Sequence, residues 1–204
     1  MFTGIVGGVT KVSAVRPLSE GRELDIARVF NRDVALGDSV ALDGVCTTVV
    51  RMTESVVTVQ LLGSTMACST LGSVRVGDPL NWELSLTPST PMGGHYVTGH
   101  VDEMGRIDRV IPRGSWAEVS MVTSGTYAHL VVLKGSVAIN GISLTVMGCG
   151  PSSVVCHVIG FTHQHTTLGR AQVGMPVNIE YDILAKYLYN SPTYRYMGGR
   201  HRGS

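Results

Sequence analysis

The stretch SVALDGVCTTV at residues 39–49 returns as SVAINGISLTV at residues 136–146, which is 97 positions further along the chain (39 to 136). Three more blocks recur in the same order, the first two at the same spacing and the third at 95. They are TLG at 70–72 and 167–169, VGxPxNxE at 76–83 and 173–180, and TGxV at 3–6 and 98–101. Four ordered matches indicate a duplicated unit, and the period is too long for a solenoid. Each copy is therefore expected to be a compact domain.

Each copy has the pattern of short strands separated by turns. Residues 56–62 and 154–159 are runs of strand length, rich in β-branched side chains. Asp43-Gly44 and Asn140-Gly141 stand between apolar runs and favour tight turns. Closing such strands into a barrel removes exposed edges. We therefore predict an all-β chain of two tandem homologous barrels followed by a short C-terminal helix.

The predicted domains are a first barrel at residues 1–94, a second barrel at 95–181, and a helix with a flexible tail at 182–204. The join is expected near the Gly-rich stretch at 91–94. Asp182 is placed to cap the helix and Pro192 to end it.

Composition restricts the function classes. Charged residues make up 15% of the chain and the net charge is +1, so no strong field favours nucleic acid or an acidic membrane. No apolar run reaches membrane-spanning length, and residues 1–6 lack the features of a signal peptide.

The four cysteines are Cys46, Cys68, Cys149 and Cys156. They form no CxxC pair, so we predict no zinc or other metal site. Reduced thiols of this kind are typical of a cytoplasmic protein. Cys68, Cys149 and Cys156 are expected to be buried small hydrophobic side chains.

Several blocks together resemble the α-type riboflavin synthase family. They are MFTGIV at 1–6, GVCTTV at 44–49, MGGHYVTGHVD at 92–102, KGSVA at 134–138, NGISLTV at 140–146 and VNIEYDILAKY at 177–187. The GGHxVxGH pattern is specific, and the likeness extends over nearly the whole chain to about Tyr187.

The resemblance implies two six-stranded, Greek-key, lumazine-binding barrels and a homotrimer. In that family the first barrel of one subunit faces the second barrel of its neighbour across the active site. The reaction is a dismutation of two 6,7-dimethyl-8-ribityllumazine molecules, in which one gives a four-carbon unit to the other. The products are riboflavin and a ribitylamino-pyrimidinedione, and no metal or cofactor takes part.

This chemistry needs a group that removes a proton from the C7 methyl and a nucleophile for the acceptor ring. His100 is the first candidate for proton transfer, because imidazole titrates near neutral pH. Cys46 and its repeat partner Ser143 are candidates for binding or adding to the ring, and packed small side chains are the alternative. Lys134 is suited to stabilising the carbanion; a solvated turn lysine is the alternative.

The remaining candidates are expected to bind substrate. Thr48 and Thr145 supply matched hydroxyls for ring carbonyls, and Phe2 is suited either to covering a ring face or to plugging the core. The full set is Phe2, Thr3, Gly4, Ser39, Thr48, Thr65, Gly99, Ser136, Thr145, Ile159, Thr162 and Asp182. His95, beside Gly93 and Gly94, is expected to be structural.

The chain also departs from the family pattern. Where the family has Glu-Thr-Leu, the copies have Ser-Thr-Met at 64–66 and Phe-Thr-His at 161–163, and Asn140 replaces a frequent Asp. His163 and His165 form an unusual pair, which is weak evidence for a metal. Two alternatives stay open: a non-catalytic lumazine or flavin carrier, and a recruited enzyme with a different substrate.

Overall fold

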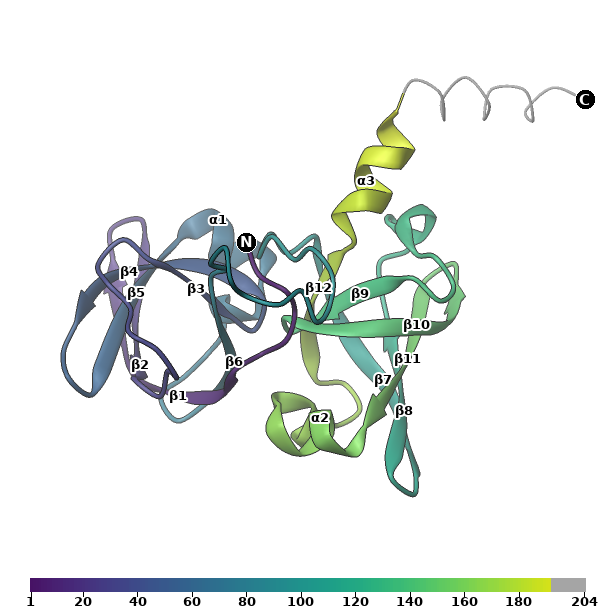
Figure 1. Ribbon diagram of the computed structural model, residues 1–204, viewed down its shortest axis with the longest axis horizontal. Helices are drawn as coiled ribbons and strands as arrows, with labels where there is room; N and C mark the ends of the chain where they lie inside the picture. Colours follow the sequence, from purple (N-terminus) through teal and green to yellow (C-terminus); the bar gives the residue numbers. More distant parts are fainter. Residues whose placement is uncertain (192–204) are drawn as a thin grey trace, which may run out of the picture.

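The computed structural model describes residues 1–191 of the chain, and within them two closed six-stranded barrels lie side by side (Figure 1). The strands of the first barrel are β1 (Gly8–Leu18), β2 (Gly21–Ala27), β3 (Ser39–Leu42), β4 (Val45–Met52), β5 (Val56–Leu62) and β6 (Pro79–Leu84). Those of the second are β7 (Glu103–Arg113), β8 (Trp116–Val122), β9 (Ser136–Ile139), β10 (Ile142–Gly150), β11 (Ser153–Ile159) and β12 (Pro176–Tyr181). The predicted all-β fold of two barrels is confirmed.

The two barrels have the same strand order. The first closes in the order β1-β2-β5-β4-β3-β6, and the second repeats it as β7-β8-β11-β10-β9-β12. Every neighbouring pair is antiparallel, as the described ladders show. The linking segment runs from Leu84 to Glu103, so the predicted division at residue 94 falls within it. The division itself stays a prediction.

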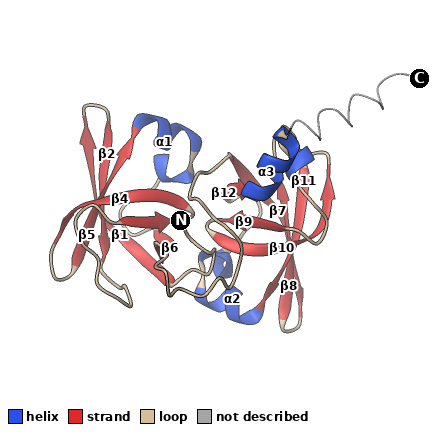
Figure 2. Cartoon of the chain, turned by 45° about the horizontal axis from the view of Figure 1, so that its top comes forward, coloured by secondary structure: helices blue, strands red, loops and turns tan. Residues whose placement is uncertain are grey.

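Short helices follow β5, β11 and β12. They are α1 (Gly63–Cys68), α2 (Gly160–His165) and α3 (Ile183–Asn190), and Figure 2 shows α1 and α2 beside the barrels. Asp182 caps α3 as predicted, because its side chain accepts a hydrogen bond from the Leu184 amide at 2.9 Å. Pro192 and the predicted flexible tail lie outside the described residues.

Side chains alternate between the inside and outside of each barrel. On β5, Val57, Val59 and Leu61 point inward and are buried, whereas Gln60 and Leu62 are exposed. Each barrel consequently has a core cluster of its own. Full burial of one such side chain stabilises the folded state by about 1.5–3 kcal/mol, so each barrel is stabilised by its own core.

The two predicted turns meet back to back where the barrels touch. Asp43, Gly44, Asn140 and Gly141 all have positive φ, at 42°, 78°, 47° and 77°, as a two-residue hairpin turn requires. A Cβ atom on Gly44 would lie 2.5 Å from the amide nitrogen of Gly141. Only glycine at this position allows the two backbones to approach so closely.

The prediction for three cysteines was partly wrong. Cys156 is buried on β11, and burial raises the pKa of its thiol to about 12. Cys68 and Cys149 are exposed. Cys68 ends α1, a helix with no buried residue, and Cys149 faces outward beyond the register shift of β10, so neither position reaches a core. Among residues 1–191, none of the helices has the length and apolar character that crossing a membrane takes.

Candidate functional site at the seam between the barrels

The first barrel carries a cavity of about 330 Å³ on its outer surface. Three predicted site residues line it: Cys46 and Thr48 from β4, and Thr65 from α1. Gln60 and Leu62 add a polar and an apolar side chain from β5, and Gln60 pairs directly with Thr48 across the ladder. The cavity therefore combines a thiol, hydroxyls and an amide with apolar walls, which suits a small polar ring.

The second barrel places its candidates at the equivalent positions. Ser143 and Thr145 lie two positions apart on β10, Ile159 ends β11, and Thr162 lies on α2. The most marked difference from the first barrel is His157. The equivalent residue of the first copy, 97 positions earlier (60 to 157), is Gln60.

His157 lies in an aromatic corner of the second barrel. Its ring packs against Trp116 with 4.2 Å between ring centroids and a tilt of 40° between the ring planes, and its Nε2 lies 3.9 Å from a carboxylate oxygen of Glu118. Trp116 pairs with Ile159 across the ladder, so this corner adjoins the predicted substrate-binding side chains.

Two segments outside the ladders connect the barrels, and we name them the first seam segment (residues 2–6) and the second seam segment (residues 97–101). They pair through a bridge between Phe2 and Val97, and Figure 2 shows the N-terminus between the barrels. Phe2 is fully buried there with Ala41, Val97 and Ala138. Of the two roles that the sequence left open, this packing is that of a core plug; contact of Phe2 with a substrate stays a prediction.

A buried carboxylate fixes each seam segment. Glu83 on β6 accepts hydrogen bonds from the Thr3 amide at 2.7 Å, the Thr3 hydroxyl at 2.8 Å and the Gly4 amide at 3.0 Å. Glu180 on β12 repeats this set with Thr98 and Gly99, at 2.6, 2.7 and 2.9 Å. In each copy, the glutamate that ends the repeated VGxPxNxE block binds the threonine and glycine of the repeated TGxV block. This contact explains why the two blocks recur together.

Each seam segment then reaches the site of the other barrel. The Gly99 carbonyl accepts from the Cys46 amide at 2.8 Å, and the Gly4 carbonyl accepts from the Ser143 amide at 2.8 Å. A Cβ atom on Gly4 or Gly99 would lie 2.6 Å from the Cβ of Ser143 or Cys46, and both glycines have positive φ. His100 directly follows Gly99, so the structure brings this candidate base and Cys46 to the same seam.

Burial dominates the electrostatics of the seam. It raises the pKa of Glu83 and of Glu180, and the hydrogen bonds from the seam segments act in the opposite direction. Burial also raises the pKa of Asp43 to about 7, with only the Asn81 amide hydrogen bond opposing it. The equivalent residue of the second copy, Asn140, is uncharged.

His95, which the sequence predicts to be structural, contacts one of the candidate site residues. Its Nδ1 lies 2.7 Å from the hydroxyl oxygen of Ser143, and its Nε2 is buried without a partner among the described residues. Burial lowers its pKa, so the neutral ring is favoured. The sequence signal was the neighbouring Gly94: a Cβ there would lie 2.1 Å from the Thr3 carbonyl oxygen, so the backbone must approach the first seam segment.

Three other candidates lie next to the residues described above. Ser39 pairs with Thr48 and Ser136 with Thr145, so each serine is beside a predicted substrate-binding threonine. Lys134 is exposed with a φ of 66°, and its ammonium lies 3.4 Å from the Met147 sulfur.

The unusual histidine pair does not converge on one point. His165 stacks on Phe161, and its Nδ1 lies 2.8 Å from the Phe161 carbonyl oxygen. His163 lines a different cavity, described below. Within residues 1–191, no three His, Cys, Asp or Glu side chains gather as a metal site would require.

Comparisons with known proteins agree with this duplicated geometry. The lumazine binding domain model matches the chain twice, at residues 3–85 and 98–182. The chain belongs to the riboflavin synthase family. Riboflavin synthase of Mycobacterium tuberculosis (strain H37Rv) is 38% identical over 193 residues, covering 92% of this chain and 96% of that protein. Riboflavin synthase of Actinobacillus pleuropneumoniae is 34% identical over 189 residues, with 92% and 88% covered.

Solved structures support the same fold. The crystal structure of LumP complexed with riboflavin has a TM-score of 0.81 at 21% identity, covering 89% of this chain and 99% of that chain. LumP complexed with 6,7-dimethyl-8-(1'-D-ribityl) lumazine has a TM-score of 0.78, also at 21% identity. At this identity the likeness supports the fold alone. Membership of the riboflavin synthase family rests on the closer sequence relatives.

Proposed function

We propose that this chain is a riboflavin synthase, which converts two 6,7-dimethyl-8-ribityllumazine molecules into riboflavin and 5-amino-6-ribitylamino-pyrimidinedione. The observation that carries the proposal is the exchange of seam segments between the two barrels, in which the segments reach the equivalent but unequal residues Cys46 and Ser143. A dismutation needs two copies of one molecule held alike and treated differently. Holding both rings in place supplies a large part of the rate, because a bimolecular step becomes effectively intramolecular.

In the proposed mechanism the two pockets take the two lumazines. Thr48 and Thr65 bind one ring in the first barrel, and Thr145, Ile159 and Thr162 bind the other in the second. Thr3, Gly4, Gly99 and Asp182 complete the two pockets, together with Ser39 and Ser136. The pseudo-symmetric clamps at Glu83 and Glu180 hold the surrounding backbone rigid.

Proton transfer is assigned to His100, which removes a proton from the C7 methyl of the donor lumazine. The nucleophile for the acceptor ring is placed at Cys46 or Ser143, and Lys134 stabilises the negative charge as the carbanion forms. His95 positions the Ser143 hydroxyl through the 2.7 Å contact. The reaction is proposed to need no metal or cofactor.

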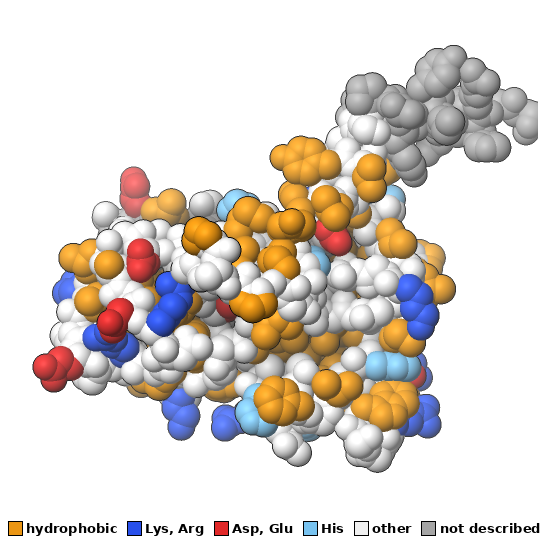
Figure 3. Space-filling view, viewed as in Figure 1, with side chains coloured by type: hydrophobic (Ala, Val, Ile, Leu, Met, Phe, Trp, Pro, Cys, Tyr) orange, Lys and Arg blue, Asp and Glu red, His pale blue; other side chains and the backbone are white. Residues whose placement is uncertain are grey.

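The assembly is proposed to be a homotrimer with the active site between the first barrel of one subunit and the second barrel of the next. In support, α3 exposes Leu184 at 54%, Tyr187 at 73% and Leu188 at 68%. Figure 3 shows hydrophobic side chains over the region of α3 and more of them between the two barrels. A cytoplasmic location is proposed from the four cysteines, which form no disulfide.

One experiment separates the candidate functions. The purified protein is mixed with 6,7-dimethyl-8-ribityllumazine, and riboflavin formation is followed by absorbance and fluorescence. Turnover is the expected result. Tight binding without turnover would instead identify a carrier, and neither binding nor turnover would point to an enzyme of different substrate.

A pair of histidine variants assigns the base. His100→Ala is expected to lower kcat by about 100-fold or more, within the range of general acid–base catalysis. His129→Ala is the control, because His129 lies on the second barrel outside the seam; its ring packs on Tyr189 of α3, so the oligomeric state of this variant is compared with that of wild type by sizing. Equal rates for wild type and His100→Ala would remove His100 from the mechanism while leaving the overall reaction open to the first assay.

A further inference from the structure

The two barrels differ at one inward position near an open end. Arg22 on β2 pairs with the buried Leu61, and Ala117 on β8 pairs with the buried Val158, so both side chains point inward. The Arg22 guanidinium reaches the Val74 carbonyl oxygen at 3.4 Å, and its Nε and Nη2 are buried. A long side chain therefore occupies this end of the first barrel, and a methyl group stands in its place in the second.

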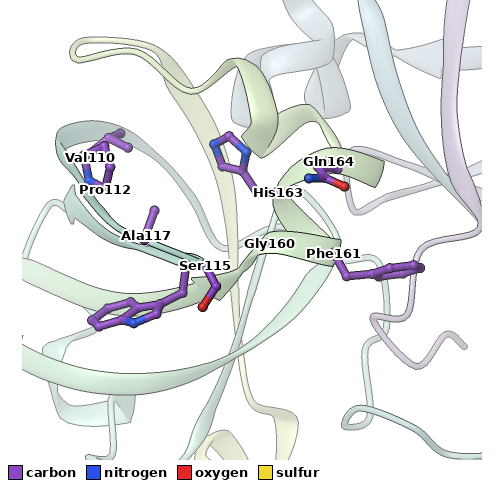
Figure 4. A pocket seen from close by; sticks show the side chains of 10 residues that line it. Val110, Pro112, Ser115, Ala117, Gly160, Phe161, His163 and Gln164 are labelled. Carbon is purple, nitrogen blue, oxygen red and sulfur yellow. The ribbon is translucent and has the colours of Figure 1, made fainter.

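A cavity of about 570 Å³ lies at this end of the second barrel, between the β7–β8 hairpin and α2. Figure 4 shows Val110, Pro112 and Ala117 on the hairpin side, with His163 of α2 pointing toward them; Gln164 follows His163 on α2 and also lines the cavity. Its volume falls within the range typical of small-molecule sites. The candidate site residues Ser143, Thr145 and Thr162 do not line this cavity, so it is distinct from the candidate sites at the seam, which we call the seam pockets.

The lining chemistry defines a class of ligand. None of the lining side chains is an acid, a lysine or an arginine, so an ion would find no partner of opposite charge. The hairpin contributes aliphatic surface through Val110, Pro112 and Ala117, whereas the Trp116 ring lies on the opposite side of β8 from Ala117 and packs on His157. The side chains of Ser115, His163 and Gln164 make no hydrogen bond to any other described residue. They are available to pair with ring nitrogens and carbonyls.

We infer that this cavity is a binding site for a neutral, planar heteroaromatic ring, separate from the two seam pockets. The ring contacts the aliphatic hairpin residues, and its polar edge pairs with His163 and Gln164. The inference does not depend on the proposed turnover, because none of the residues assigned to the reaction lines the cavity.

Riboflavin is a suitable test molecule, because its ring is neutral, planar and rich in hydrogen-bonding groups. The binding stoichiometry is measured by equilibrium dialysis. Tryptophan fluorescence is not used as the signal, because Trp116 packs on His157 and pairs with Ile159 at the seam side of β8. Wild type is expected to bind one more riboflavin per chain than the blocking variants described below.

The blocking variants take their side chains from the first barrel. Ala117→Arg introduces the residue of position 22, and His163→Met introduces that of position 66, which packs against the first-barrel core. Each is expected to weaken binding at this site at least tenfold and to change lumazine turnover less than twofold. Ala35→Arg adds the same charge at an exposed position of the first barrel and is expected to match wild type.

The outcomes are distinct. Unchanged stoichiometry in a folded Ala117→Arg, or in His163→Met if the arginine variant does not fold, would overturn the inference. Loss of turnover together with binding would overturn its separateness from the seam pockets. Absence of turnover in wild type, with the variant-sensitive site intact, would overturn only the proposed function.

Discussion

The first and second barrels share a backbone frame and differ in the side chains that the frame presents. Each has a seam segment clamped by a buried glutamate, and each receives the other's segment at an equivalent amide, that of Cys46 or Ser143. The thiol of Cys46 in the first barrel corresponds to the hydroxyl of Ser143 in the second. His95 contacts only the second of these groups, at Ser143.

This difference shows how a duplicated domain acquires two roles. The hydrogen bonds that join the barrels run through backbone groups and through residues identical in both copies, such as Asn81 and Asn178. Positions outside that set can diverge without disturbing the seam. A donor pocket and an acceptor pocket can therefore develop within one symmetric frame, which is what the proposed dismutation needs.

Removing either clamp should have the largest effect. Glu180→Ala leaves the amides of Thr98 and Gly99 without their acceptor, and Glu83→Ala does the same to Thr3 and Gly4. Each unsatisfied buried donor costs about 1–3 kcal/mol, so we expect a loss of about 3–5 kcal/mol in the free energy of unfolding. Urea denaturation measures this loss, and the lumazine assay should show activity falling with it.

The Gln variants sharpen the comparison. Glu180→Gln and Glu83→Gln keep one carbonyl oxygen for the threonine and should retain more than half of the lost stability. If one Ala variant unfolds and the other matches wild type, the two clamps are not equivalent and the shared-frame argument fails.

The next largest effect concerns the two turn residues, Asp43 and Asn140. Burial raises the pKa of Asp43 from 3.8 to about 7, so its contribution to stability is fully present below pH 4 and is lost as the pH rises through 7. Asp43→Asn removes this loss and keeps the bond to the Asn81 amide, as Asn140 does with Asn178. We expect the variant to be more stable than wild type at pH 8, by a few kcal/mol, and equal to it at pH 4.

The measurement is the difference in free energy of unfolding between Asp43→Asn and wild type across pH 4–8. Taking the difference cancels the contributions of Glu83 and Glu180, whose raised pKa values are present in both proteins. A difference that does not change with pH would show that Asp43 keeps an ordinary pKa at the junction.

Much of this arrangement was predictable from the repeat. Its spacing and turn residues predicted two closed barrels, and Asp182 was correctly expected to cap a helix. The repeat also paired Cys46 with Ser143. These predictions succeed because they depend on local turn geometry and on the period-two pattern of strands.

The contacts at the seam were not predictable, because they join residues about 50 to 140 positions apart. No local pattern indicates that Gly99 reaches Cys46, or that His95 reaches Ser143. The wrong expectation for Cys68 and Cys149 has a similar cause. The usual burial of cysteine is an average over many environments, and it does not apply at the end of a surface helix or beyond a bulge.

The smallest effect tests the junction itself, where the symmetry is broken by one hydrogen bond. The Thr167 hydroxyl accepts from the Asn81 side-chain amide at 2.9 Å, whereas the equivalent Thr70 hydroxyl is buried without a partner among the described residues. Thr167→Val should therefore cost about 1 kcal/mol of stability, the usual net value of one such bond.

Thr70→Val removes a buried hydroxyl that forms no bond, so its stability should equal or exceed that of wild type by up to about 1 kcal/mol. Both threonines keep their backbone bonds to Asn178 and Asn81, so the two variants differ only in the hydroxyl. Thermal unfolding of the pair at one pH measures the contrast. Equal destabilisation by both would mean that Thr70 has a partner such as a bound water, and that the junction is more symmetric than its protein–protein hydrogen bonds indicate.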